Sequence, residues 1–154
     1  MQISTQFSVF MVNKPGILAQ VLSEFAAGKI NLVAMTMMDS VEHGVMRLVF
    51  TKPEPAREVL KKLNLPFSET QVLCVSLNNK SGELATLAEK LAKNHINITY
   101  AYCTAGAKGG KTTGVFKVAD VKKATKILES HEKRKTHTKK AATAPVRRSK
   151  AKRK

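Results

Sequence analysis

The sequence predicts an α+β fold of two similar units packed side by side, each an antiparallel sheet with its helices on one face. The main observation is a repeat. Three separated blocks recur at one constant offset, namely N-K-P-G-I-L-A at 13–19 as N-K-S-G-E-L-A at 79–85, I-N-L at 30–32 as I-N-I at 96–98, and V-F at 49–50 as V-F at 115–116. A constant offset over separated blocks indicates a duplicated structural unit. Because a unit that spans less than half of the chain has only a marginal core of its own, the two units should share a sheet or an interface.

The periodicity of the apolar residues gives the order of the elements. Alternating apolar residues predict strands, apolar residues three and four apart predict helices, and glycine, proline and asparagine mark the breaks. The segment 66–77 is extended and should hold both the last strand of the first unit and the first strand of the second. The predicted elements are, in the first unit, strand 6–12, a helix from Ile17 to Gly28, strands 30–38 and 44–50 and a helix opened by Pro53 and Pro55, and, in the second unit, strand 72–78, helix 83–93, strands 96–104 and 112–118 and helix 120–129.

This is the βαββαβ order of a ferredoxin-like unit, but the second copy lacks its last strand. After the last helix the chain continues with His131–Lys135, whose charge density cannot bury a strand face. The sequence therefore divides into a first unit over 1–70, a second unit over 71–130 without a closing strand, and a tail over 131–154. The open edge of the second unit is either paired by another chain or left short.

The tail is strongly basic. The 154 residues carry 27 Lys and Arg against 11 Asp and Glu, a net charge of +16, and residues 131–154 hold 11 of the basic residues and one acid, Glu132. Such a segment cannot form a core and is predicted to be disordered. Two interpretations stay open, a solubilising extension and a tail that binds nucleic acid through counterion release. In the second case the binding residues are Lys133, Arg134, Lys135, Lys139, Lys140, Arg147, Arg148, Lys150, Lys152, Arg153 and Lys154.

The remaining composition argues against several classes of protein. Cys74 and Cys103 form neither a disulfide framework nor a metal-ligand pair, and their apolar surroundings predict buried free thiols in a reducing compartment. The four histidines show no metal-ligand spacing. No signal peptide and no apolar run of membrane-spanning length is evident. We therefore expect a cytoplasmic, non-enzymatic protein with no metal, no cofactor and no attachment to a membrane.

The repeated loop is the candidate binding site. It joins a strand to a helix in each unit, and its glycine lets the backbone come close to a ligand or to another backbone. The free N–H groups at the start of the following helix suit a carboxylate. The simpler alternative is a helix cap with a tight turn. Asn31 and Asn97 have a similar alternative, as turn residues that satisfy nearby backbone groups.

The motif N-x-x-G-x-L-A after an apolar strand, followed by I-N-[LI] at the second strand, resembles the ACT domain. The resemblance covers both units, about residues 3–129. Within this family, the chain most resembles the tandem-ACT proteins that bind amino acids. It implies a regulatory module that binds a small effector, most often an amino acid, at this loop and against a neighbouring ACT unit, here in a homodimer. The implied ligand-binding residues are Asn13, Lys14, Pro15, Gly16, Ile17, Leu18 and Asn31 in the first unit, and Asn79, Lys80, Gly82, Leu84 and Asn97 in the second.

The second loop departs from the pattern. Ser81 replaces Pro15, and Glu83 replaces Ile17. Because an acid opposes the binding of a carboxylate beside it, the first loop is the favoured site.

Tyr100 and Tyr102 lie on one face of the predicted strand 96–104, and their counterparts in the first unit are Ala34 and Thr36. Packing in the core or at an interface is the expected role, with the wall of a ligand pocket as the alternative. Two other functions stay open for the whole chain. It could act on nucleic acid through its tail, or it could be the regulatory subunit of a biosynthetic enzyme such as acetolactate synthase, whose small subunit also carries an ACT unit.

Overall fold

The computed structural model describes residues 1–38, 43–104 and 110–129. Their strands form a six-stranded antiparallel sheet in the order β2-β3-β1-β4-β6-β5. The elements are β1 (Gln2–Val12), α1 (Ile17–Ala27), β2 (Leu32–Met38), β3 (His43–Phe50), α2 (Pro53–Lys62), β4 (Phe67–Asn78), α3 (Glu83–Lys93), β5 (Ile98–Cys103) and β6 (Lys111–Val118), followed by a helix over 121–129. The predicted α+β fold and the order of its elements are confirmed.

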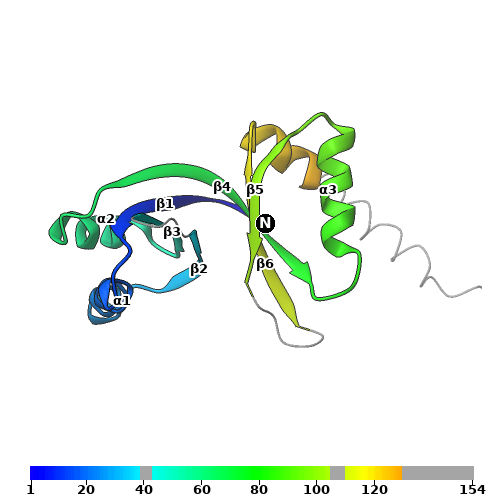
Figure 1. The fold of residues 1–154 in the computed structure, drawn as a ribbon. Coiled ribbons are helices and arrows are strands. Elements are labelled where there is room, and N and C mark those ends of the chain that lie inside the picture. The colour runs from blue at the N-terminus through cyan, green and yellow to red at the C-terminus, as the bar shows by residue number, and fades with distance from the viewer. Residues whose placement is uncertain (39–42, 105–109, 130–154) are drawn as a thin grey trace, which may run out of the picture.

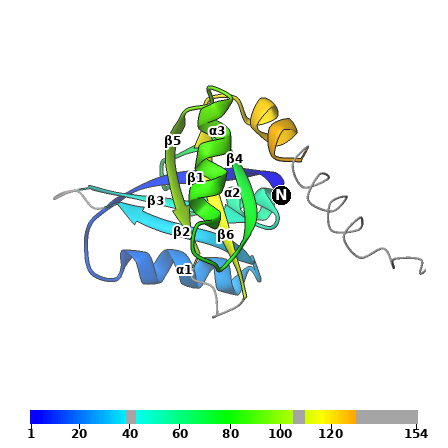
Figure 2. The same cartoon turned by 90° about the vertical axis from the view of Figure 1, so that its right-hand side faces the viewer.

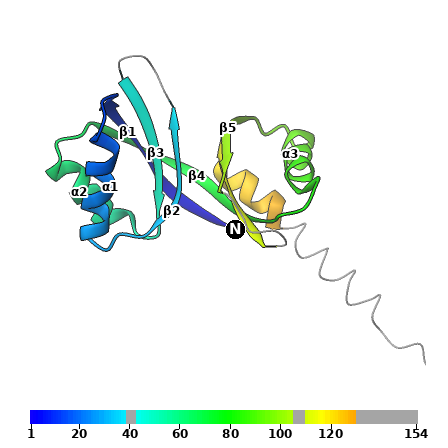
Figure 3. The ribbon, with the colours of Figure 1, turned by 60° about the horizontal axis from the view of Figure 1, so that its bottom comes forward.

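The sheet curls so that the helices lie on the outer sides of the molecule. α1 and α2 lie on one side and α3 on the opposite side, with the strands between them (Figures 1 and 3). In the first unit the odd-numbered residues of β1, among them Phe7 and Val9, pack against Phe25 of α1 and Leu60 of α2. In the second unit α3 lies in front of β4 and β6 when the molecule is viewed from the α3 side (Figure 2), and Leu87 and Leu91 of α3 pack on that part of the sheet.

One long strand, β4, belongs to both units. Its first eight residues, Phe67–Cys74, pair with β1, and its last six, Leu73–Asn78, pair with β6. The expected boundary between residues 70 and 71 therefore falls inside a continuous strand. We propose that the chain is organised as two units and that β4 is shared between them.

The strand registers correct one part of the repeat. Phe7 faces Leu48 across β1 and β3, and Leu73, the counterpart of Phe7 at the constant offset of the repeat, faces Phe116 across β4 and β6. Leu48 and Phe116 are therefore counterparts, and their offset is larger by two positions. The match of Val49-Phe50 with Val115-Phe116 does not pair equivalent positions, because the chain from Tyr102 to its partner Val115 is two residues longer than the chain from Thr36 to its partner Arg47.

The two units meet through the faces of the sheet that carry no helix. Ala34 and Val49 of the first unit pack with Val115 and Tyr102 of the second. Gln6, which is fully buried between them, donates from Nε2 to the Tyr100 hydroxyl over 2.7 Å and accepts at Oε1 from the Tyr102 hydroxyl over 3.1 Å. The expected interface role of the two tyrosines is therefore correct.

The same interface holds a cation on an aromatic ring. The Arg47 guanidinium carbon lies 3.9 Å from the centre of the Tyr100 ring. Such contacts contribute about 0.5–2 kcal/mol, depending on how far the cation is desolvated.

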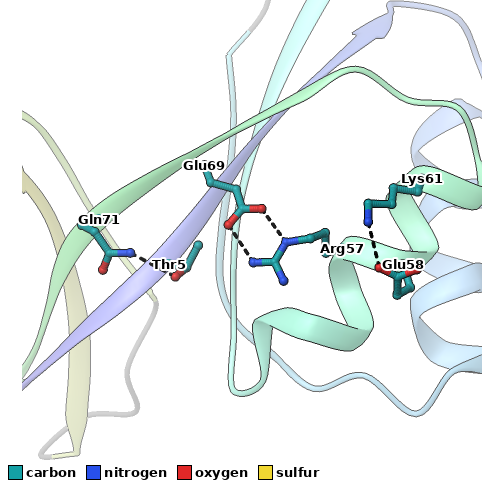
Figure 4. Close-up of polar contacts among 6 residues, drawn as sticks. All are labelled: Thr5, Arg57, Glu58, Lys61, Glu69 and Gln71. Atoms are coloured by element: carbon teal, nitrogen blue, oxygen red, sulfur yellow. Dashed lines mark hydrogen bonds and ion pairs between the residues drawn. The ribbon is translucent and has the colours of Figure 1, made fainter.

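An ion pair fixes α2 to the strand that both units share. Nε and Nη2 of Arg57 on α2 donate to the two carboxylate oxygens of Glu69 on β4, over 2.6 and 2.8 Å (Figure 4). These hydrogen bonds lower the pKa of Glu69 and raise the pKa of Arg57. On the same stretch of β4, the Gln71 amide donates to the Thr5 hydroxyl of β1 over 3.2 Å.

Two further expectations concern the second unit. Cys74 is buried, as predicted, but Cys103 is exposed, because it lies on the outermost strand, β5, with its side chain on the side away from Tyr102. The missing closing strand and the basic tail fall on residues 130–154, outside the described residues. Where a closing strand would pair with β4, Gln2–Ser4 of β1 lies beside Val72–Cys74.

Candidate functional site

The loops before α1 and α3 have the same backbone geometry. In the first, the Lys14 N–H donates to the Val12 carbonyl over 3.0 Å, and in the second the Lys80 N–H donates to the Asn78 carbonyl over 2.8 Å. The next bond also repeats, since the residue after each glycine donates to the lysine carbonyl. The repeat in the sequence is therefore a repeat of one particular turn.

The two glycines are required by the backbone conformation. Gly16 and Gly82 cap the following helices with φ values of +90° and +85°, in the left-handed region that other L-residues rarely adopt. Apart from its two chain neighbours, a Cβ added at either position would meet no atom of the described residues within 4 Å. In this structure the conformation, and not a close approach of another backbone, explains why the glycine recurs at the same place in both copies of the motif.

The N-cap residues of α1 and α3 are glycines, so within the described part of the chain neither N-cap residue donates a side-chain cap to its helix. The first N–H groups of a helix have no partner inside the helix, so each of these ends can accept an anion. The charges around the two ends differ. α1 has no acid in its first turn, whereas α3 begins with Glu83. A carboxylate is therefore better accommodated at α1.

The side chains of the first loop divide into two groups. Asn13, Lys14 and Pro15 are exposed, whereas Ile17 and Leu18 are half-buried and pack on the core of the first unit. In the second loop Asn79, Lys80 and Ser81 are likewise exposed, but Leu84 is 47 % exposed. The polar residues of the first loop are available to a ligand, while Ile17 and Leu18 hold the helix on the sheet.

The structure does not bring Asn31 to this loop. Asn31 lies at the far end of α1, where its carbonyl accepts the Thr51 N–H over 3.1 Å. With 11 residues, α1 separates the two places by about 16 Å. Asn97 has the same position in the second unit, where its carbonyl accepts the Ala119 N–H over 3.4 Å. Within one unit, the two predicted groups of ligand-binding residues therefore lie at opposite ends.

Two cavities adjoin the predicted residues. One, of about 310 Å³, is lined by Asn31 together with Gly28, Lys29, Ile30, Thr51, Lys52 and Pro55. The other, of about 180 Å³, lies between α3 and β4 and includes Asn78 and Glu83 beside the second loop. The sequence reasoning missed Lys29, Thr51 and Lys52. The sequence does not show that Thr51 and Lys52 lie beside Asn31, because the whole of β2 and β3 separates them along the chain. Only the fold of the sheet brings these residues together.

Other kinds of site find no support in the described part of the chain. No group of three or more His, Cys, Asp or Glu residues within 1–38, 43–104 and 110–129 is arranged to hold a metal ion. No helix among these residues has the length and apolar character needed to cross a membrane. The proposed nucleic-acid-binding residues of the tail lie outside the described ranges, and the comparisons below give no support to a nucleic-acid partner.

Several solved structures are similar to this chain. Protein BT0572 from Bacteroides thetaiotaomicron is 26 % identical, with a TM-score of 0.77, over 84 % of this chain and 89 % of that one. The ligand-free regulatory subunit of aspartate kinase from Thermus thermophilus is 14 % identical, with a TM-score of 0.62, over 84 % and 97 % of the two chains. Aspartokinase III from E. coli, solved with lysine and aspartate, is 16 % identical, with a TM-score of 0.53, over 84 % of this chain and 30 % of that one.

A search of curated protein sequences gave no significant match. The family model described as an ACT domain pair, in contrast, matches residues 1–141. Together with the repeated strand–loop–helix turn and the two ferredoxin-like units, this match identifies the chain as a member of the ACT domain pair family.

Proposed function

We propose that this protein is a non-enzymatic regulatory protein that binds a small amino acid at the loop Asn13–Leu18. The observation that carries the proposal is the repeated, uncapped turn in a chain of the ACT domain pair family. One structure of similar fold is of a regulatory subunit of aspartate kinase, and another was solved with lysine and aspartate, which supports an amino acid as the effector.

The chemistry of the first loop suits the carboxylate of an amino acid. The carboxylate binds at the start of α1, where the helix dipole contributes about 0.3–1 kcal/mol at an exposed site. The exposed Asn13 amide and the Lys14 ammonium lie in the turn that leads to this helix and supply further polar contacts. Because Glu83 takes the place of Ile17, the second loop binds a carboxylate more weakly.

We also propose that the protein is a homodimer. Phe10, Val12 and Met38 are 45–48 % exposed, and the strand registers place them with Val45 on the helix-free face of the first unit. This apolar patch continues the face that the second unit already covers at Ala34 and Val49. Val12 directly precedes Asn13, so a second copy seated on the patch lies beside the proposed loop and completes its site.

Isothermal titration of the full chain with each of the twenty amino acids tests the effector site. We expect saturable heat from one amino acid or a few related ones. Asn13→Ala should weaken this binding about tenfold, the loss expected for one hydrogen bond to a charged group. The matched variant Asn79→Ala, in the second loop, should leave it within a factor of two. No heat from any amino acid, or equal losses in both variants, would contradict the proposal.

A further inference from the structure

We infer that the cavity at the far end of α1 is a second binding site, specific for a small anion that carries a phosphate or carboxylate group. It is separate from the Asn13–Leu18 loop and does not depend on the function proposed for that loop. Its volume of about 310 Å³ lies at the lower end of the range for small-molecule sites.

The lining of the cavity is positively charged. Lys29 and Lys52 line it from the end of α1 and the start of α2, and none of the lining residues that the structure describes carries a carboxylate. Neither lysine forms an ion pair with any residue that the structure describes, whereas Arg57, Lys61 and Lys62 nearby on α2 are each paired with a glutamate. The two ammonium groups therefore remain available to an anion from solution.

The neutral lining residues are suited to a small ligand. The Asn31 and Thr51 side chains make no hydrogen bond to any residue of the described ranges, so an amide and a hydroxyl are free to bind. Ile30 and Pro55 add an apolar wall. The backbone of this wall is held by the end of α1, where the Lys29 N–H donates to the Ala26 carbonyl and the Ile30 N–H to the Phe25 carbonyl, both over 2.9 Å.

The second unit shows what happens when the same place already holds a carboxylate. The backbone N–H of Thr51 donates to the Asn31 carbonyl, as the backbone N–H of Ala119 donates to the Asn97 carbonyl. Lys52, which follows Thr51, is therefore the counterpart of Asp120. The Asp120 carboxylate accepts the Lys123 N–H over 2.8 Å and caps the helix over 121–129. The first unit has a lysine at the capping position, with no side-chain cap, and Pro55, which has no N–H, in place of Lys123.

This exchange reverses the charge of the site at little structural cost. Pro55 has no N–H, so an aspartate at position 52 could not accept the hydrogen bond that Asp120 accepts from Lys123. The first unit therefore does not need a capping carboxylate at this position. A lysine there instead presents a cation beside Lys29. The second unit has Ala119 in place of Thr51 and Asp120 in place of Lys52, so the anion site is confined to the first unit.

Amide chemical shifts in ¹⁵N-labelled full chain test the inference, with inorganic phosphate and acetate as probes and sodium chloride to hold the ionic strength constant. We expect saturable shifts at Lys29–Asn31 and at Thr51 and Lys52 with at least one of the two probes. Which probe binds identifies the anion class. No saturable shift with either, or shifts confined to Asn13–Leu18, would overturn the inference.

Two variants separate a specific site from general attraction by a basic protein. Lys29→Gln with Lys52→Gln should weaken binding at least tenfold, since two charge-assisted contacts are lost. Lys93→Gln with Lys126→Gln removes the same charge from exposed positions in the second unit and should change the affinity less than twofold. Thr51→Ala with Lys52→Asp copies the second unit and should abolish the shifts. Equal losses in the two lysine pairs would refute a specific site, and the spectra themselves report whether each variant is folded.

Discussion

Gln6 is a fully buried polar residue at the contact between the two units. Its amide is shared between two hydroxyls of β5, a strand of the other unit, so both its donor and its acceptor are satisfied without water. A buried amide with a missing partner costs about 1–3 kcal/mol, which is more than the hydrogen bond contributes when it is formed. This cost favours one relative position of the two units over others.

Tyr102→Phe tests this role. Removing the hydroxyl leaves the Gln6 oxygen unsatisfied, and we expect the free energy of unfolding to fall by about 1–3 kcal/mol at neutral pH in urea titrations. Thr99→Val, on the exposed side of the same strand, should change it by less than about 0.5 kcal/mol. A Tyr102→Phe variant as stable as the wild type would contradict the role.

The same tyrosine predicts a dependence on alkaline pH. Burial raises the pKa of Tyr102 above its ordinary value of about 10. The folded state thus disfavours the phenolate, so this contribution to stability is complete below pH 10 and is lost as the pH rises above 10. In Tyr102→Phe the stability should fall less between pH 9 and pH 11 than in the wild type.

At the scale of the elements, β3 and β6 solve the same packing problem with different residues. The registers place Gly114 at the counterpart of Met46, and Phe116 at the counterpart of Leu48. The Phe116 ring covers Gly114 so closely that a Cβ added there would lie 2.6 Å from the ring. A large and a medium side chain in the first unit are thus replaced by an aromatic ring and a glycine in the second.

Gly114→Ala should therefore destabilise the protein by about 1–3 kcal/mol through overpacking, since the Phe116 ring is buried and cannot move away freely. Gly44→Ala on β3 is the matched control. The atom nearest to its added Cβ is the end of the flexible and exposed Met37 side chain, at 3.3 Å, so we expect a smaller loss. Thermal unfolding of both variants measures the difference, and a larger loss in Gly44→Ala would disprove the packing argument.

The elements themselves could be predicted from the sequence, because each has a clear apolar period. The larger offset between the counterparts on β3 and β6, by two residues, could not be predicted from the sequence. A shift of two residues keeps every side chain on its own face of the sheet, so the alternation of apolar and polar residues is unchanged. Val49-Phe50 and Val115-Phe116 look equivalent for this reason, and only the pairing with β1 and β4 shows that they are not.

At the scale of the whole molecule, the exposed apolar patch on the helix-free face of the first unit predicts a homodimer. Sedimentation should give a particle of twice the chain mass, and Phe10→Lys with Met38→Lys should shift it to monomer, because two charges would then be buried in the contact. Leu84→Lys changes a side chain of similar exposure on α3 and should leave the dimer intact. A dimer that survives the first pair of changes would rule out this face as the contact.

The sequence by itself determined the two units, their elements and the turn that recurs before α1 and α3, because these depend on local residue patterns and on a repeat that can be read along the chain. The tertiary structure decided which of the predicted residues share a site. Asn31 is close in sequence to the first loop, but a helix of 11 residues carries it to the opposite end of the unit, beside Thr51 and Lys52. Pairing between strands brings those residues together, and no local pattern encodes it. For the same physical reason the buried contact of Gln6 with Tyr100 and Tyr102 became clear only from the fold.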